Sequence, residues 1–100
     1  MPRYAVKVDS NHAVLKAAFE KLGCAVLDLA RVGKSCPDLL VAMGCTACLV
    51  ELKSRPKPLR RDAHQEDFRA SWGGWADVAR DMGDVERIVA QMRAIHRRQA

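Results

Sequence analysis

Apolar residues near both ends of the chain recur every three or four positions, which is the spacing of an amphipathic helix. In the N-terminal segment, Asp9, Ser10 or Asn11 can cap the helix, and Gly23 is a natural residue to end it. The expected buried face of this helix consists of Val14, Leu15, Ala18, Phe19 and Leu22. Residues 84–98 carry a stronger version of the pattern, and their expected buried face consists of Val85, Ile88, Val89, Met92 and Ile95. The sequence therefore predicts a helix near each end of the chain.

Between these helices the apolar residues form short continuous runs, which are typical of buried strands. Three such runs occupy residues 24–32, 37–43 and 48–53. Residues 44–47, GCTA, are typical of a turn that joins the second and third runs into a hairpin. A fourth run, residues 75–80, completes the expected set of strands.

A further helix is expected between the third and fourth strands. Asp62 can cap residues 62–72, in which Ala63, Phe68 and Trp72 lie partly on one face, and two glycines follow the segment. Because a helix separates the fourth strand from the third, the pattern favours a mixed sheet with helices on its faces. The predicted fold class is α/β, with elements in the order α-β-β-β-α-β-α.

Length and composition bound the kind of protein that this sequence can encode. One hundred residues, of which 49% are apolar, suit a single domain over residues 1–100 with a real core. The sequence has no apolar run of about eighteen residues and no signal peptide, so we expect a cytoplasmic protein with no membrane partner. A net charge of +5 raises the affinity for polyanions such as nucleic acid, although many soluble domains carry a similar excess.

The four cysteines are Cys24, Cys36, Cys45 and Cys48. Without an export signal, they indicate reduced thiols or a metal site before they indicate disulfides. Cys45 and Cys48 form a CTAC pair that would be half of a zinc site, but Cys24 and Cys36 lie too far apart in sequence to form a second close pair. We interpret the cysteines as free, buried thiols that pack as small apolar groups, with a zinc-bound interaction domain as the weaker alternative.

The two strands of the expected hairpin carry three charged residues, Asp38, Glu51 and Lys53. Glu51 and Lys53 are two positions apart on one strand, so their side chains share a face, and Asp38 begins the partner strand. Two carboxylates at a strand end suit Mg²⁺, and a neighbouring lysine could position a water or stabilise charge on a phosphate. The alternative is a surface ion pair between Glu51 and Lys53, with Asp38 following a proline at a turn.

The order of these residues resembles the signature of the PD-(D/E)XK nuclease superfamily, with Pro37-Asp38 on one strand and Glu51-Leu52-Lys53 on the next. The wider stretch VGKSCPDLLVAMGCTACLVELKSRPKPL, followed by Gln65 and then WGG, resembles small phage-associated VRR-NUC domains. Those domains are similar to Holliday-junction resolvases and restriction-type endonucleases. The resemblance covers nearly the whole chain and implies a restriction-endonuclease-like core with the same α-β-β-β-α-β order.

That resemblance implies a Mg²⁺- or Mn²⁺-dependent endodeoxyribonuclease that hydrolyses phosphodiester bonds in a bacterial or phage-infected cell. Asp38, Glu51 and the backbone carbonyl of Leu52 would bind the metal, and Lys53 would orient or activate the water. Gln65 matches a glutamine near the active site of such proteins, with a solvated helix residue as the alternative. A non-catalytic DNA-binding module that retains the nuclease fold is the competing interpretation of the whole chain.

The resemblance departs from the family pattern at the first helix, where many relatives place a further acid. Here the region reads Asp9-Ser10-Asn11-His12, and Asn11 or His12 could supply a weaker ligand or a water contact. With one carboxylate fewer, such a site would hold a second metal ion poorly.

DNA is the expected partner, in duplex or branched form. Basic residues near the Glu-x-Lys strand would contact phosphates without reading base sequence, although a solvated basic loop is the alternative; these residues are Lys34, Arg55, Lys57, Arg60 and Arg61. A branched junction requires two coordinated cuts, so we expect a homodimer. Trp72, Trp75 or Met82 could contribute to its contact surface.

Overall fold

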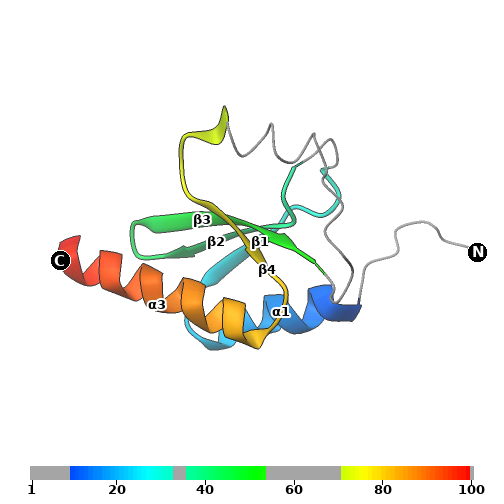
Figure 1. Ribbon diagram of the computed structural model, residues 1–100, viewed down its shortest axis with the longest axis horizontal. Coiled ribbons are helices and arrows are strands. Elements are labelled where there is room, and N and C mark those ends of the chain that lie inside the picture. The colour runs from blue at the N-terminus through cyan, green and yellow to red at the C-terminus, as the bar shows by residue number, and fades with distance from the viewer. Residues whose placement is uncertain (1–9, 33–35, 54–70, 100) are drawn as a thin grey trace, which may run out of the picture.

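The computed structural model describes residues 10–32, 36–53 and 71–99, and it shows a small α/β domain (Figure 1). The elements in chain order are α1 (Ser10–Lys21), β1 (Ala25–Asp28), β2 (Leu39–Met43), β3 (Thr46–Leu52), β4 (Ala76–Ala79) and α3 (Met82–Gln99). This order confirms the predicted helix, four strands and final helix. The helix predicted over residues 62–72 lies outside the described residues, apart from its helical last two, Ser71 and Trp72.

The four strands form one mixed sheet in the order β1-β2-β3-β4. The pairs β1–β2 and β2–β3 are antiparallel, whereas β3–β4 is parallel. Met43 pairs with Thr46, so the hairpin turn contains only Gly44 and Cys45, and it is two residues shorter than predicted. Gly44 has a φ of 63°, which a residue without Cβ adopts freely. A Cβ at this position would also collide with the His96 ring.

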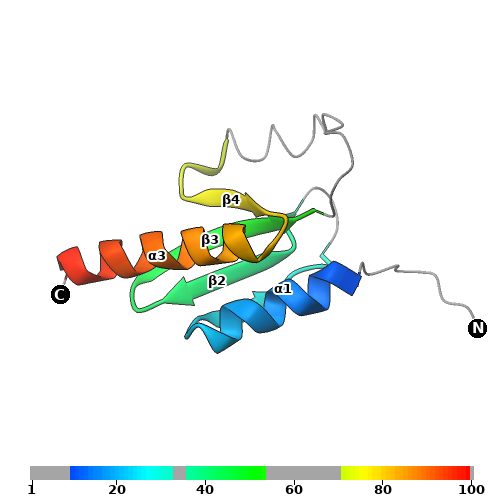
Figure 2. The same ribbon diagram turned by 60° about the horizontal axis from the view of Figure 1, so that its bottom comes forward.

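Both described helices cover the same face of the sheet, as the two views show (Figures 1 and 2). Alternate residues of the central strands point toward these helices, as the two-residue period of a strand requires. The buried core consists of Leu15, Ala18, Phe19, Cys24, Leu39, Val41, Cys48, Val50, Ala79, Val85, Ile88, Val89 and Met92. The predicted apolar face of α3 is confirmed, and Ile95 is its one partly buried member.

The ends of α1 and α3 follow ordinary capping chemistry. Gly23 ends α1 as predicted: its φ is 102°, and the flanking N–H of Cys24 donates to the Phe19 carbonyl at 3.0 Å. Helix α3 begins two residues earlier than predicted. The carboxylate of Asp81 accepts a hydrogen bond from the Asp84 N–H at 2.9 Å, which is the N-cap arrangement.

Two further details of the predicted pattern are wrong. Val14 is 57% exposed, because α1 turns His12 rather than Val14 toward the sheet, and His12 is only 8% exposed. The first strand ends at Asp28 instead of residue 32, because the chain turns over residues 30–32. In the part of the chain that the structure describes, no helix combines the length and hydropathy that crossing a membrane requires.

Candidate functional site

Asp38 is fixed at the point where strand β2 begins. Pro37 precedes it and has no N–H, so it cannot donate a hydrogen bond to β3. The Asp38 carboxylate takes the place of a ladder acceptor, because its Oδ2 accepts a hydrogen bond from the Leu52 N–H at 2.8 Å. The Asp38 backbone carbonyl also accepts one from the Leu29 N–H at 2.7 Å. Asp38 is therefore held from both sides: β3 binds its carboxylate, and the residue that follows β1 binds its backbone carbonyl.

Glu51 and Lys53 lie near the end of β3, on the face of the sheet opposite the two helices. Val50 belongs to the core beneath the helices, so its neighbour Glu51 points the other way. Glu51 is only 8% exposed, and a buried carboxylate needs compensation. The Lys53 Nζ lies 3.8 Å from Glu51 Oε2, which is ion-pair distance but longer than a hydrogen bond.

The strand register brings Asp38 toward the same place. Leu39 pairs with Val50, so one step further puts Asp38 opposite Glu51, and opposed residues of an antiparallel pair share a face. The thiol of Cys36 lies close enough to both acids to be affected by their charge. Burial raises the pKa of this thiol, and the negative charges of Asp38 and Glu51 raise it further. The structure therefore places both carboxylates at one end of the β2–β3 hairpin.

The backbone of Leu52 adds a further oxygen at this end. In an antiparallel ladder, the N–H and C=O of one residue point toward the same neighbouring strand. Because the Leu52 N–H points to Asp38, the Leu52 carbonyl also points toward the β2 side of the strand. Two carboxylates and a carbonyl form a set of hard oxygen donors. Over residues 10–32, 36–53 and 71–99, no group of three His, Cys, Asp or Glu side chains is placed to hold a metal ion.

Asn11 and His12, the candidate contributors from the first helix, are directed to different places. The Asn11 Nδ2 donates to the backbone carbonyls of Lys53 and Arg80, each at 3.2 Å, so its amide contacts the backbone beside the site. The His12 Nε2 lies 3.1 Å from Asp28 Oδ2.

The partner of His12 places it away from the site. Asp28 pairs with Leu39, so its side chain shares the helix-covered face of the sheet, opposite the face that carries Glu51. His12 is 8% exposed and its ring contacts Asp28, on the face that the helices cover, and its suggested contribution to the site stays a prediction. The Ala30 N–H and then the imidazole of His12 hold the pKa of Asp28 below its usual value.

The remaining predicted site residues lie outside the described residues: Gln65, Lys34, Arg55, Lys57, Arg60 and Arg61. The cysteines are described, and Cys24 and Cys48 are buried as predicted. Cys45 is exposed because it lies in the two-residue turn, so the prediction was wrong there. Cys48, by contrast, is 1% exposed, and burial raises the pKa of its thiol to about 12.

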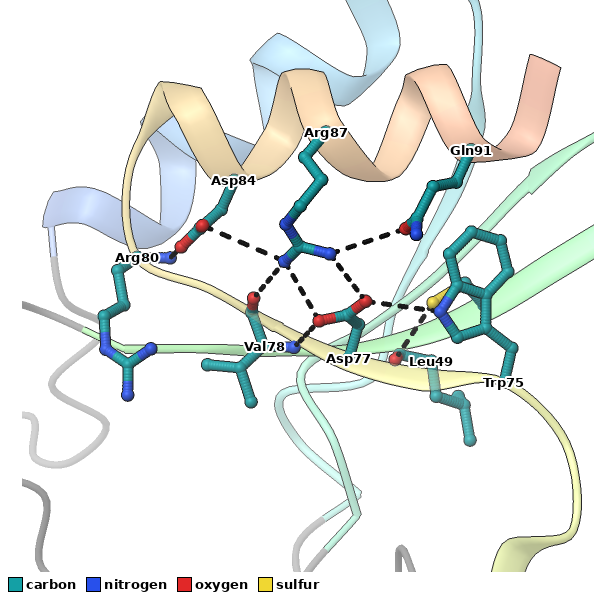
Figure 3. Close-up of polar contacts among 9 residues, drawn as sticks. Leu49, Trp75, Asp77, Val78, Arg80, Asp84, Arg87 and Gln91 are labelled. Atoms are coloured by element: carbon teal, nitrogen blue, oxygen red, sulfur yellow. Dashed lines mark hydrogen bonds and ion pairs between the residues drawn. The ribbon is translucent and has the colours of Figure 1, made fainter. Parts of the chain in front are cut away.

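One polar cluster was not singled out from the sequence (Figure 3). Both guanidinium nitrogens of Arg87 donate to the two carboxylate oxygens of Asp77, each at 3.1 Å, which is a bidentate pair. The Trp75 Nε1 donates to Asp77 Oδ2 at 3.3 Å, and the Val78 N–H donates to Oδ1 at 2.8 Å. The pair joins β4 to α3. A ten-residue separation across a turn carries no periodic signal, so sequence patterns could not reveal it.

The same cluster affects the pKa of its own members. Burial alone would raise the pKa of Asp77, but hydrogen bonds from Arg87, Val78 and Trp75 outweigh it and lower that pKa. The hydrogen bond with Asp77 in turn raises the pKa of Arg87. Arg87 Nη2 also donates to the Val78 carbonyl at 3.5 Å, so the pair covers backbone groups of Val78 on edge strand β4. Its evident role is structural.

No protein-family model matches this chain, and no curated protein matches it significantly. We therefore infer the function from the side chains and backbone groups that the fold brings together. These are the acids Asp38 and Glu51, the cation of Lys53, the carbonyl of Leu52, and the Asn11 amide behind them.

Proposed function

We propose that the protein is a metal-dependent DNA endonuclease of the VRR-NUC type, within the PD-(D/E)XK superfamily, that hydrolyses phosphodiester bonds in branched DNA such as a Holliday junction. The observation that carries the proposal is the meeting of three charges at one end of the β2–β3 hairpin. Asp38 is fixed across the hairpin by the Leu52 N–H at 2.8 Å, and Lys53 Nζ lies 3.8 Å from Glu51.

The donor set fits Mg²⁺ or Mn²⁺. Mg²⁺ in proteins commonly takes one or two carboxylates and keeps several waters, so Asp38, Glu51 and the Leu52 carbonyl suffice. The Leu52 N–H engages only Oδ2 of Asp38, which leaves Oδ1 for a cation. Glu51 is 8% exposed, and a cation would offset the cost of its buried charge. When bound, the ion would supply Lewis-acid activation of the phosphate and of an attacking water.

Lys53 is suited to stabilise charge at the reacting phosphate. Its side chain is 32% exposed, and its ammonium nitrogen lies 3.8 Å from Glu51 Oε2. Its backbone N–H donates to the Ala79 carbonyl at 3.1 Å, which anchors the residue at the end of the parallel pair. A fixed cation can orient a water or stabilise developing negative charge without a reorganisation cost at the moment of reaction.

The charge of the chain supports DNA as the substrate, because a net charge of +5 favours polyanions. The proposed phosphate contacts are Lys34, Arg55, Lys57, Arg60 and Arg61. The homodimer remains part of the proposal, because two cuts in a junction suit two-fold symmetry. Of the three residues suggested for its surface, Trp72 and Met82 are 45% and 43% exposed, whereas Trp75 packs partly on the core.

The proposal is tested with labelled Holliday junctions, flaps and linear duplex, each incubated with Mg²⁺, with Mn²⁺ and with EDTA. We expect cleavage of at least one branched substrate with metal and none with EDTA. Lys53→Ala should abolish that cleavage, whereas Lys16→Ala, which removes an α1 lysine paired with Glu20, should not. If the wild-type protein cuts none of the substrates, the proposal fails.

One observation favours the competing function, a DNA-binding module without catalysis. The first helix presents Asn11 where many related nucleases have an acid, and its amide is engaged by backbone carbonyls. Calorimetry discriminates between the two. Binding of Mn²⁺ that disappears in Asp38→Asn and Glu51→Gln supports the nuclease, and DNA binding without any such metal site supports the module.

A further inference from the structure

Asn11 joins three elements at the end of the candidate site. It lies in the first turn of α1, and its Nδ2 donates to the carbonyls of Lys53 and Arg80, each at 3.2 Å. Lys53 is the residue after β3, and Arg80 is the residue after β4. A backbone hydrogen bond at the end of this parallel pair runs from the Lys53 N–H to the Ala79 carbonyl at 3.1 Å. Asn11 therefore links the ends of β3 and β4 by hydrogen bonds to the residue that follows each strand.

The amide suits this position for a chemical reason. An amide nitrogen carries two N–H donors, which matches two carbonyl acceptors, whereas a carboxylate donates none and a hydroxyl donates one. Because both neighbours are acceptors, the amide nitrogen and not the oxygen must face them. Both N–H donors of the amide are engaged, so its nitrogen is committed to the two carbonyls and only its oxygen is left for another contact.

We propose that Asn11 is a positioning residue: its amide nitrogen holds the Lys53 backbone and so sets the place of the Lys53 ammonium beside Glu51. This inference rests on the proposed nuclease function for its catalytic consequence. The Lys53 carbonyl that Asn11 holds belongs to the same residue as the proposed catalytic ammonium, and Glu51 is two residues away. A shift of about 1 Å in a reacting group can cost about 100-fold in rate.

The discriminating variant is Asn11→Asp. A ligand role predicts that a carboxylate here binds metal better and cleaves DNA at least as fast as wild type. The positioning role predicts the opposite, because a carboxylate cannot donate and instead repels the two carbonyl oxygens. We expect kcat to fall about 100-fold in Asn11→Asp and in Asn11→Ala, with the KM for DNA unchanged. Lys16→Ala, on the same helix, serves as the control.

A second measurement separates this inference from the nuclease claim. Amide hydrogen exchange, followed by NMR in folded protein, reports on the strand end without DNA or metal. We expect faster exchange at the Lys53 N–H in both Asn11 variants and unchanged exchange at Val50, which lies inside the β2–β3 ladder. Wild-type kcat in Asn11→Asp, or unchanged exchange at Lys53, overturns the inference. If wild type cuts no DNA, the nuclease proposal fails, and the exchange rates alone decide whether Asn11 holds the strand ends.

Discussion

The Leu52 N–H donates a hydrogen bond to the carboxylate of Asp38 at 2.8 Å, so a side chain at the start of β2 completes the ladder at the end of β3. This bond couples the position of an acid to the register of the hairpin. Because the hairpin turn is only two residues long, the register is fixed, and Asp38 is held opposite Glu51. The proposed metal site therefore depends on the register of the β2–β3 pair, which sets Asp38 opposite Glu51.

Substitution of Asp38 separates its structural role from its chemical role. Asp38→Asn keeps an oxygen that accepts from the Leu52 N–H, so we expect little change in the free energy of unfolding. Asp38→Ala leaves that N–H without its acceptor and should cost about 1–2 kcal/mol. Both variants lack the charge and should lose metal-dependent cleavage. Urea unfolding and cleavage assays measure the two effects, and cleavage by Asp38→Asn at the wild-type rate would refute the proposed role.

The pair of Asp77 and Arg87 should contribute modestly to stability. The Arg87 side chain is 44% exposed, so solvent screens the pair, and we expect a coupling free energy of about 1 kcal/mol. A double-mutant cycle with Asp77→Asn and Arg87→Met measures it through urea unfolding at pH 7. A coupling indistinguishable from zero would show that the bidentate contact does not contribute.

The same pair predicts a loss of stability in acid. The pKa of Asp77 in the folded protein lies below its ordinary value of 3.8, so folding favours the ionised form. The stabilisation that ionised Asp77 contributes is complete when the pH is above 3.8, and it is lost as the pH falls through the lowered pKa of the folded protein. The free energies of unfolding of wild type and Asp77→Asn should therefore differ at pH 6, and the difference should shrink as the pH falls below 3.8. A difference that stays constant over this range would contradict the assignment.

The cysteines should differ sharply in reactivity toward iodoacetamide. Cys45 is exposed, whereas Cys48 is buried and its thiol has a pKa of about 12. Since the thiolate is the reactive form, Cys45 should be modified at pH 8 while Cys48 remains unmodified in the folded protein. Peptide mass spectrometry follows both sites, and unfolding in urea should make them react alike. Labelling of native Cys48 as fast as Cys45 would contradict the core described for the sheet.

The fold could be predicted where one physical cause dominates. The apolar face of α3 was predicted from hydrophobic periodicity, and the two strands of the hairpin were predicted from continuous apolar runs. Both were found, although each strand begins two residues away from its predicted start. The face of α1 was not predicted correctly, because hydrophobicity favours Val14 over His12. Burial of His12 depends on a partner, Asp28, that lies sixteen positions away in sequence. Periodicity has no access to such a contact.

Some parts of the candidate site could likewise be predicted from the sequence, and others could not. Glu51 and Lys53 are two apart on one strand, so sequence alone puts them on one face. The opposition of Asp38 and Glu51 also needs the turn length, which the structure supplies. The contacts of Asn11 join it to carbonyls 42 and 69 positions away, and backbone groups leave no trace in a sequence pattern. The predicted roles of Gln65 and the basic loop stay predictions.

The most direct test of the nuclease proposal is the rate of Mg²⁺-dependent cleavage of one Holliday junction by wild type, Glu51→Gln and Lys53→Met, at equal concentrations of folded protein. The account predicts cleavage by wild type that EDTA abolishes. It also predicts at least a 100-fold lower rate in both variants, the range expected when a fixed electrostatic group is removed from a reacting centre. Cleavage by either variant at the wild-type rate, or no cleavage by wild type of any branched substrate, would contradict it.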